Sequence, residues 1–298
     1  MKYERKILIT GASGLLGRRL TARLQGMGDV SGTGFSHTAG RLFPVDLRDA
    51  EALNGLLNEV RPDVVVHSAA YRDPDFCEDH PEEAFCLNVA PVELFCELLP
   101  ESVPLLFISS DYVFEGLAAP YREEDERHPV SEYGRLKVEA EDLVLQRDAG
   151  LVLRIPLLIG AGPTWESSGF IFRTLAQIQD PSPSILDHAG IRFPTWTNDV
   201  AEAVAHLLGI EGRGVFHYSS LDGGTKYEWA LELADLAGLS MEHITPNWEG
   251  SATRAVRPRD TQLAVEKIRR TGLSRFTPFR KAVRSMLEGA TDHDLMPE

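Results

Sequence analysis

The chain has 298 residues, of which 43% are hydrophobic and 25% charged, a composition that is typical of a folded protein and excludes an intrinsically disordered one. Its 30 Lys and Arg against 45 Asp and Glu give a net charge of −15. This acidic balance argues against a nucleic-acid or anionic-membrane binder, because such proteins present a basic surface. The stretches without charged residues reach only about 11 residues, whereas a membrane-spanning helix needs about 20. We therefore expect a soluble cytoplasmic protein with no nucleic-acid partner and no membrane.

Three cysteines, Cys77, Cys86 and Cys96, are too few for a disulfide framework and lack the paired spacing of a structural zinc site. This cysteine usage fits a reducing compartment. We expect no metal site.

Short apolar runs alternate with helical patterns over the first 160 residues. The pattern predicts strands at 6–10, 30–35, 42–45, 63–67, 105–110 and 151–155, and helices at 15–24, 50–59, 81–98 and 131–146. Such alternation is typical of βαβ units that form a parallel sheet. The sequence therefore predicts an α/β fold with a Rossmann-type doubly wound parallel sheet.

The pattern loosens after residue 160, where glycine and proline become frequent. A helix is expected near 198–208, a strand near 215–219, and helices with connecting loops within 225–238 and 261–289. We predict a dinucleotide-binding domain at 1–160, to which 195–220 returns. The remaining residues, 161–194 and 221–298, would form a smaller, partly interleaved C-terminal substrate-binding region.

The first predicted strand leads directly into a G-x-x-G-x-x-G turn formed by Gly11, Gly14 and Gly17. The first glycine permits a tight turn, the second lets the backbone approach a pyrophosphate, and the third allows a helix to pack closely on the strand. An ordinary strand-to-helix turn is the alternative. The dinucleotide hypothesis assigns the cofactor's phosphates to this loop and to the helix that follows it, including Ser13, Leu15, Leu16 and Arg18.

The choice of dinucleotide depends on the end of the second strand, where an NAD-selective site usually carries a carboxylate. Here the strand ends at Phe35, Ser36 and His37 without one. Arg18, His37 and Arg41 are suited to a 2′-phosphate, although each is equally acceptable as a surface residue. We therefore predict a preference for NADP(H), with NAD(H) as a second possibility.

Tyr133 and Lys137 stand four residues apart at the start of a predicted helix, so both lie on one face of it. A free tyrosine, with a pKa of about 10, is a poor acid–base catalyst near neutrality, and a neighbouring ammonium favours its ionised form. The pair therefore indicates acid–base chemistry. In the alternative interpretation Tyr133 covers the core and Lys137 pairs with Glu141 on the solvent face.

The strand at 105–110 ends in the hydroxyls of Ser109 and Ser110, followed by Asp111. The carboxyl ends of parallel strands are where α/β sheets bind ligands, so Ser110 is placed to hydrogen-bond a substrate carbonyl. Strand-end serines also close turns without any role in binding.

In this order along the chain, the motifs resemble the extended short-chain dehydrogenase/reductase family. They are TGASGLLG (10–17), HSAAYRDP (67–74), LNV (87–89), ISSDYVFEG (108–116), PYREED (120–125) and YGRLK (133–137). Within the family the chain is similar to dTDP-4-dehydrorhamnose reductases and, more closely, to the regulatory β subunits of methionine adenosyltransferase. The closer similarity rests on GLLGR, RPDVVVH, SSDYVF, PYREED, LRIPLLIG, RFPT, TKYE, RPRDTQL and TPFR.

The resemblance implies a catalytic triad of Ser110, Tyr133 and Lys137. Tyr133 would protonate the carbonyl oxygen as hydride arrives from the nicotinamide, Lys137 would bind the nicotinamide ribose, and Ser110 would orient the carbonyl. Further cofactor contacts are assigned to Ser36, Asp46, Leu47, Ala69, Ala70, Tyr71, Asn88, Ser109, Ile155 and Pro156. Substrate contacts are assigned to Asp111, Val113, Arg192, Arg257 and Arg259.

One departure concerns the sugar site, where rhamnose-pathway reductases carry a tryptophan and this chain has Leu157. In addition, Arg254, Arg257 and Arg259 cluster where family members hold a substrate diphosphate, an anion that guanidinium groups suit. A surface ion pair between Arg259 and Asp260 is the alternative.

Two functions are therefore predicted. The first is an NADPH-dependent reductase of a keto nucleotide sugar, a small-molecule substrate, with a homodimer among the oligomeric states that the sequence leaves open. The alternative is an NADP-binding regulatory subunit whose partner is a methionine adenosyltransferase catalytic subunit.

Overall fold

A seven-stranded parallel sheet forms the centre of the computed structural model, which describes residues 5–35, 42–162, 164, 166–250 and 253–288. The strands lie in the order β10-β6-β5-β4-β1-β2-β3, and every neighbouring pair is parallel. The Rossmann-type doubly wound sheet predicted from the sequence is confirmed. The strands are β1 (Lys6–Thr10), β2 (Asp29–Gly34), β3 (Leu42–Pro44), β4 (Val64–His67), β5 (Leu105–Ser110), β6 (Gly150–Ile155) and β10 (Gly214–His217).

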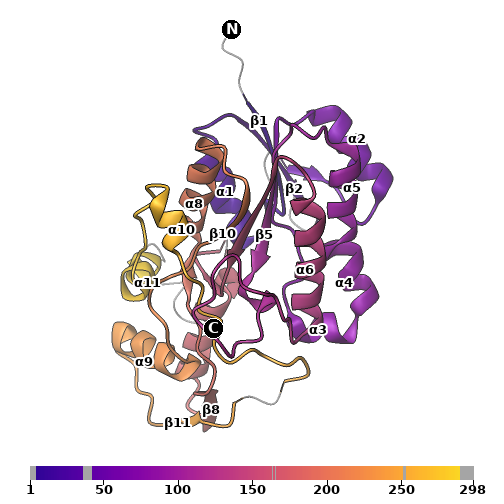
Figure 1. The fold of residues 1–298 in the computed structure, drawn as a ribbon. Coiled ribbons are helices and arrows are strands. Elements are labelled where there is room, and N and C mark those ends of the chain that lie inside the picture. The colour runs from indigo at the N-terminus through magenta and orange to yellow at the C-terminus, as the bar shows by residue number, and fades with distance from the viewer. Residues whose placement is uncertain (1–4, 36–41, 163, 165, 251–252, 289–298) are drawn as a thin grey trace.

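Helices cover both faces of this sheet (Figure 1). The apolar sides of α1 (Leu15–Leu24) and α8 (Thr197–Gly209) pack on one face, and those of α2 (Ala50–Val60), α5 (Ala90–Leu98) and α6 (Glu132–Leu145) on the other. Strands β4, β5 and β6 are buried along their whole length. Burial on both faces explains their continuous apolar sequence.

The structure corrects two predictions in the first half of the chain. The helix predicted at 81–98 is two helices, α4 (Pro81–Asn88) and α5, separated at Val89. Pro91 lies in the first turn of α5, a position that proline tolerates because its missing N–H needs no partner there. A six-residue helix, α3 (Pro74–Asp79), was not predicted, because so short a segment shows no helical periodicity.

The C-terminal half contains a second hydrophobic core built by α7 (Phe170–Gln179), α9 (Lys226–Ala237) and α11 (Phe279–Glu288). Two parallel strands, β8 (Ser184–Asp187) and β11 (Ile244–Asn247), extend this part of the molecule. Helix α7 and strand β8 lie where the sequence pattern loosens and where no element was predicted, so both were missed. The remaining elements are β7 (Leu158–Ile159), β9 (Thr195–Trp196), α10 (Glu266–Arg270) and two 3₁₀ helices, η1 (Asp111–Val113) and η2 (Glu166–Ser168).

Residues 195–220 include α8, which packs beside α1, and β10, which pairs with β6 at the edge of the central sheet. The chain thus leaves the sheet after β6 and rejoins it at β10. The exact division into domains stays a prediction.

Candidate functional site

The glycine turn between β1 and α1 is held too tightly for side chains at two of its positions. Gly11 has a φ of +68°, and a Cβ there would come within 2.9 Å of the Ala69 backbone. A Cβ on Gly17 would lie 2.0 Å from the Gly11 carbonyl oxygen. Gly14 precedes α1 without a side chain that caps the helix. The first N–H groups of α1 therefore find no side-chain acceptor at this residue, which leaves them free to donate to an anion at the end of the helix.

The loop after β4 lies directly against this glycine turn. The Ser68 hydroxyl donates to the Thr10 carbonyl at 2.7 Å, and the Ala69 N–H donates to the Thr10 hydroxyl at 3.4 Å. Tyr71 and Asn88 exchange two hydrogen bonds, of 2.8 and 2.9 Å, between backbone and side-chain amide. The structure therefore brings Gly11, Ala69, Tyr71 and Asn88 into one continuous wall at the carboxyl ends of β1 and β4.

The end of β2 carries a feature that was not foreseen. The Arg48 guanidinium binds both Asp46 oxygens at 2.8–3.2 Å and lies 5.4 Å from the Phe35 ring centroid. Its hydrogen bonds hold the pKa of the Asp46 carboxyl below its ordinary value. Leu47 points into the core under α2. Three predicted contacts, Ser36, His37 and Arg41, lie outside the described residues.

Lys137 is buried beneath the end of β5. Only 3% of the residue is exposed, and its ammonium group donates to the Ile108 carbonyl at 3.0 Å. Burial lowers the pKa of Lys137 to about 8, although the Glu141 carboxylate acts in the opposite direction. The alternative in which Lys137 and Glu141 form a solvent-facing pair is wrong, because both side chains are buried.

Tyr133 lies one turn before Lys137, whose Nζ atom is 5.8 Å from the centre of the tyrosine ring. Burial raises the pKa of the Tyr133 hydroxyl, and an interaction with Ser110 offsets part of this effect. The Ser110 hydroxyl also accepts the Tyr112 N–H at 3.2 Å. The structure thus brings Ser110, Tyr133 and Lys137 together, as the sequence predicted for a triad.

Ser109 has a different environment from its neighbour. Its hydroxyl donates to Glu141 at 2.5 Å, on the side of β5 that faces α6. Val113 is fully buried in a small apolar cluster with Phe114. Ile155 belongs to the core below α1 and α8, and the next residue, Pro156, is also buried.

Asp111 connects the triad to the C-terminal half of the chain. Its carboxylate accepts hydrogen bonds from Ser110 at 3.1 Å and from Thr261 at 2.5 Å. Burial raises its pKa to about 6, while Thr261 and the positive charge of Arg192 oppose the change. Arg192, which is 7% exposed, also donates to the Pro258 carbonyl at 3.0 Å. Two predicted substrate residues, Asp111 and Arg192, are therefore neighbours.

The predicted arginine cluster is divided among different partners. Arg257 donates to Asp75 of α3 at 2.9 Å, and its Nη1 atom is buried without a hydrogen-bond partner among the described residues. Arg254 pairs with Asp79, also of α3. Arg259 is exposed. Its proposed partner Asp260 instead accepts the Gln262 N–H at 3.0 Å.

Lys226, at the start of α9, adds a cation that sequence reasoning missed. Burial lowers its pKa, and the nearby charges of Arg192, Arg257 and Arg173 add to this effect, while Asp187 opposes it. The four cations come from separate parts of the chain. They leave a local excess of positive charge in a protein that is acidic as a whole.

Comparison with known proteins agrees with this architecture. The family model described as "RmlD substrate binding domain" matches residues 5–291. The chain belongs to this family. Its resemblance to the extended short-chain dehydrogenase/reductases is thereby confirmed.

This member of the RmlD family is 38% identical to methionine adenosyltransferase 2 subunit beta from Bos taurus, over 95% of the chain and 87% of that relative. Among solved structures, a dTDP-4-dehydrorhamnose reductase from Clostridium acetobutylicum is 27% identical, with a TM-score of 0.83 over 95% of this chain and 98% of that one. A dTDP-4-dehydrorhamnose reductase from Bacillus anthracis, solved in complex with NADP, shares the fold with a TM-score of 0.84 at 20% identity, over 97% of this chain and 100% of that one.

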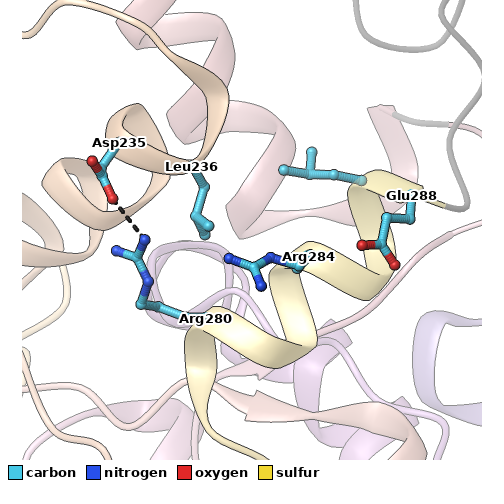
Figure 2. A pocket seen from close by; sticks show the side chains of 6 residues that line it. Asp235, Leu236, Arg280, Arg284 and Glu288 are labelled. Atoms are coloured by element: carbon cyan, nitrogen blue, oxygen red, sulfur yellow. Dashed lines mark hydrogen bonds and ion pairs between the residues drawn. The ribbon is translucent and has the colours of Figure 1, made fainter.

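A surface hollow elsewhere on this RmlD-family chain lies between α9 and α11 (Figure 2). Its lining residues are Asp235, Leu236, Arg280, Arg284, Leu287 and Glu288, none of which was predicted to bind a ligand. Arg280 is already paired with Glu232 and Asp235, both at 2.6 Å. The hollow therefore offers no match to the site chemistry described above.

Within the residues that the structure describes, no group of three or more His, Cys, Asp or Glu side chains is placed to hold a metal ion. None of the described helices combines the length and the apolar character needed to cross a bilayer.

Proposed function

We propose that this protein is an NADP(H)-dependent reductase that acts on the keto group of a nucleotide sugar. The observation that carries the proposal is the convergence of Ser110, Tyr133 and Lys137 at the end of β5. Its similarity to the dTDP-4-dehydrorhamnose reductase from Clostridium acetobutylicum supports the same reaction class.

The glycine turn fits a dinucleotide because no side chain stands between its backbone and the phosphates, so the backbone N–H groups can approach them closely. Gly11 and Gly17 would hold the pyrophosphate against the start of α1, with Ala69, Ala70 and Asn88 along the central groove. Arg18, exposed in the first turn of α1, is a described cation that could contact a 2′-phosphate, whereas Arg48 is already paired with Asp46. When bound, the nicotinamide supplies the hydride.

Tyr133 would act as the proton donor. Burial raises its pKa, contrary to the ionisation that the neighbouring ammonium was expected to favour, so the hydroxyl stays protonated at neutral pH and would donate its proton to a carbonyl oxygen that gains negative charge. Ser110 has one hydroxyl proton, which it donates to Asp111, so it would orient that oxygen by redirecting this proton toward it. Lys137 would hold the cofactor ribose with the N–H groups that do not bind Ile108, and its positive charge favours ionised Tyr133 after proton transfer.

The substrate's anionic part would extend from the triad toward the C-terminal half. Arg192, Lys226 and Arg257 concentrate positive charge on this side, and charge-assisted hydrogen bonds from guanidinium groups suit a diphosphate. Leu157 takes the place where rhamnose-pathway reductases carry a tryptophan. We therefore expect a keto sugar that does not depend on aromatic stacking.

The test is NADPH oxidation by the purified protein with a panel of nucleotide-linked keto sugars, including a dTDP-4-keto-6-deoxy sugar. Tyr133→Phe should reduce the turnover by about 10²- to 10⁴-fold and leave the NADPH dissociation constant within about twofold. The matched control is Tyr227→Phe, because Tyr227 packs in the second core and not at the triad. The absence of turnover across the panel, with NADPH bound, would contradict the reductase proposal.

A second function is favoured by a separate observation, the 38% identity to methionine adenosyltransferase 2 subunit beta over 95% of the chain. In this function the protein binds NADP and regulates a methionine adenosyltransferase catalytic subunit. Affinity purification from the native cell, followed by the synthetase assay, tests it. A synthetase that neither copurifies nor changes its kinetics on addition of the protein would exclude this role.

A further inference from the structure

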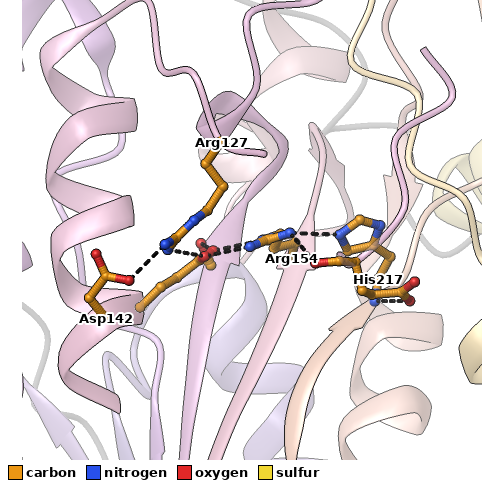
Figure 3. Close-up of polar contacts among 7 residues, drawn as sticks. Arg127, Asp142, Arg154 and His217 are labelled. Atoms are coloured by element: carbon orange, nitrogen blue, oxygen red, sulfur yellow. Dashed lines mark hydrogen bonds and ion pairs between the residues drawn. The ribbon is translucent and has the colours of Figure 1, made fainter. Parts of the chain in front are cut away.

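Glu141 is a fully buried carboxylate on α6, one turn beyond Lys137. The charged groups that contact it include Arg127 and Arg154, whose polar contacts Figure 3 shows. Glu141 accepts two hydrogen bonds from Arg154, at 2.7 and 2.9 Å, and one from Arg127 at 3.1 Å. The Ser109 hydroxyl supplies a fourth at 2.5 Å. The carboxylate is therefore saturated with donors, as a buried charge requires.

Arg154, on β6, has the opposite charge and is almost as deeply buried, with 2% of its side chain exposed. Its Nη1 atom lies 3.3 Å from the Glu123 carbonyl and 3.2 Å from His217 Nε2. Arg127 extends the network outward to Asp142 at 2.7 Å. These contacts join α6 to β6, β10 and the segment that precedes α6.

The network is connected to the triad through β5. Lys137 donates to the carbonyl of Ile108, and Glu141 accepts from the side chain of Ser109, the next residue along the strand. Two successive turns of α6 are thus bound to two successive residues of β5. Any displacement of Glu141 would move the turn that carries Lys137.

The charges around Lys137 make Glu141 its main counter-charge. The groups that face the ammonium are Tyr133 and Glu141 on α6, Cys77 on α3 and His67 on β4. Burial raises the pKa of Cys77 to about 11 and lowers that of His67 to about 3, so both are neutral near pH 7. The pKa of Tyr133 is also raised, which leaves Glu141 as the anion that faces Lys137 among these groups.

We propose that Glu141 is a positioning residue for Lys137: held by Ser109 and Arg154, its carboxylate fixes α6 on β5 and keeps the buried ammonium charged. The inference rests on the proposed function, because a charged, fixed Lys137 is what ribose binding and Tyr133 chemistry require. A buried ion pair stabilises a fold little compared with apolar residues of the same size. Stability alone therefore explains the charge of Glu141 poorly.

The first experiment measures the pKa of Lys137 directly, without cofactor. The chain has six lysines, so the ¹³C-labelled ε-methylene signal of Lys137 can be assigned with Lys137→Arg and titrated by NMR from pH 6 to 10. Glu141→Gln removes the counter-charge of Lys137 and should therefore move the midpoint of this titration to lower pH by about one unit or more. A shift of one unit is a tenfold change in the protonation equilibrium. The matched control Glu139→Gln removes an exposed carboxylate of the same helix, which pairs with Arg135, and should cause no shift.

A double variant separates positioning from simple stabilisation. Glu141→Gln leaves Arg154 as an uncompensated buried charge, whereas Glu141→Gln with Arg154→Met removes both charges and should recover most of the lost stability. In this double variant we expect the titration midpoint of Lys137 to stay below the wild-type midpoint. As the pH rises, NADPH binding should also begin to weaken at a lower pH than in the wild type. If the double variant folds and titrates like the wild type, Glu141 has only a structural role. NADPH binding by the wild type is scored separately, so failure of the proposed function is distinguished from failure of this inference.

Discussion

Replacing Gly17 with alanine places a methyl group where the structure has backbone. The new Cβ would lie 2.0 Å from the Gly11 carbonyl oxygen and 2.6 Å from the Ala12 Cα atom. Neither atom belongs to a flexible side chain, so the glycine turn must move away from α1. Because this turn is the proposed pyrophosphate site, the substitution should affect both stability and cofactor binding.

The expected magnitude comes from two opposing effects. Alanine favours a helix over glycine by about 0.8–1 kcal/mol. Overpacking in a well-packed region typically costs about 1–3 kcal/mol, and a contact this short against backbone places Gly17→Ala at the upper end. We therefore expect a net loss of about 2 kcal/mol. Gly55→Ala in α2 is the matched control, because nothing lies within 4 Å of its new Cβ, and it should stabilise the protein by up to about 1 kcal/mol.

Urea unfolding of the two variants, with NADPH titration of each, provides the assay. Gly17→Ala should lower the midpoint of unfolding and weaken NADPH binding by about tenfold or more, one order of magnitude being about 1.4 kcal/mol. Gly55→Ala should raise the midpoint and leave binding unchanged. Equal midpoint shifts in the same direction, with equal NADPH affinity, would refute the assignment of a rigid phosphate turn.

Three further predictions concern the remaining charged groups. Burial raises the pKa of Asp111 to about 6 from an ordinary 3.8. Ionised Asp111 therefore lowers the free energy of unfolding above pH 6, and this destabilisation disappears as the pH falls through 6 toward 4. Asp111→Asn should therefore stabilise the protein at pH 7.5 by on the order of 2 kcal/mol, an advantage that urea unfolding at pH 4.5 should find greatly reduced. Arg257→Met should raise the KM for the nucleotide sugar about tenfold with little change in kcat. The control Arg254→Met removes a more exposed guanidinium and should change neither constant. Equal effects of the two substitutions would contradict a specific anion site at Arg257. Arg18→Gln should weaken NADPH binding and leave NADH binding unchanged, and a parallel loss of both would exclude contact with the 2′-phosphate.

The predicted triad illustrates how far local sequence can lead. Tyr133 and Lys137 are four residues apart on one helix, so helical geometry alone places them together. Ser110 follows because it ends a parallel strand, and such ends face the ligand site. Even so, only the packing of α6 on β5, which buries Lys137, excludes the alternative with a solvent-exposed Lys137.

Regular structure was predictable wherever one local pattern dominates. Strands β1 and β5 and helix α1 have the predicted bounds, because buried strands are continuously apolar and the helix begins directly after the glycine turn. The sequence pattern did not show the break at Val89, so α4 and α5 were predicted as one helix. It also did not show the helices α3 and α7. In these segments short length or tertiary packing outweighs the periodicity on which such predictions depend.

The amino-acid sequence by itself determined the doubly wound sheet, the glycine turn and the residues of the candidate triad. Each depends on a pattern that is visible along the chain: alternating strands and helices, the glycine spacing, and a Tyr–Lys pair on one helix with a serine at a strand end. Tertiary structure decided which partners each charged group meets. Asp111 meets Thr261 across 150 residues and Arg257 meets Asp75 across 182, while Glu141 and Arg154 form a buried pair from a helix and the strand after it. The energy of a charge depends on its burial and its neighbours, and both are properties of the folded chain rather than of any segment of it.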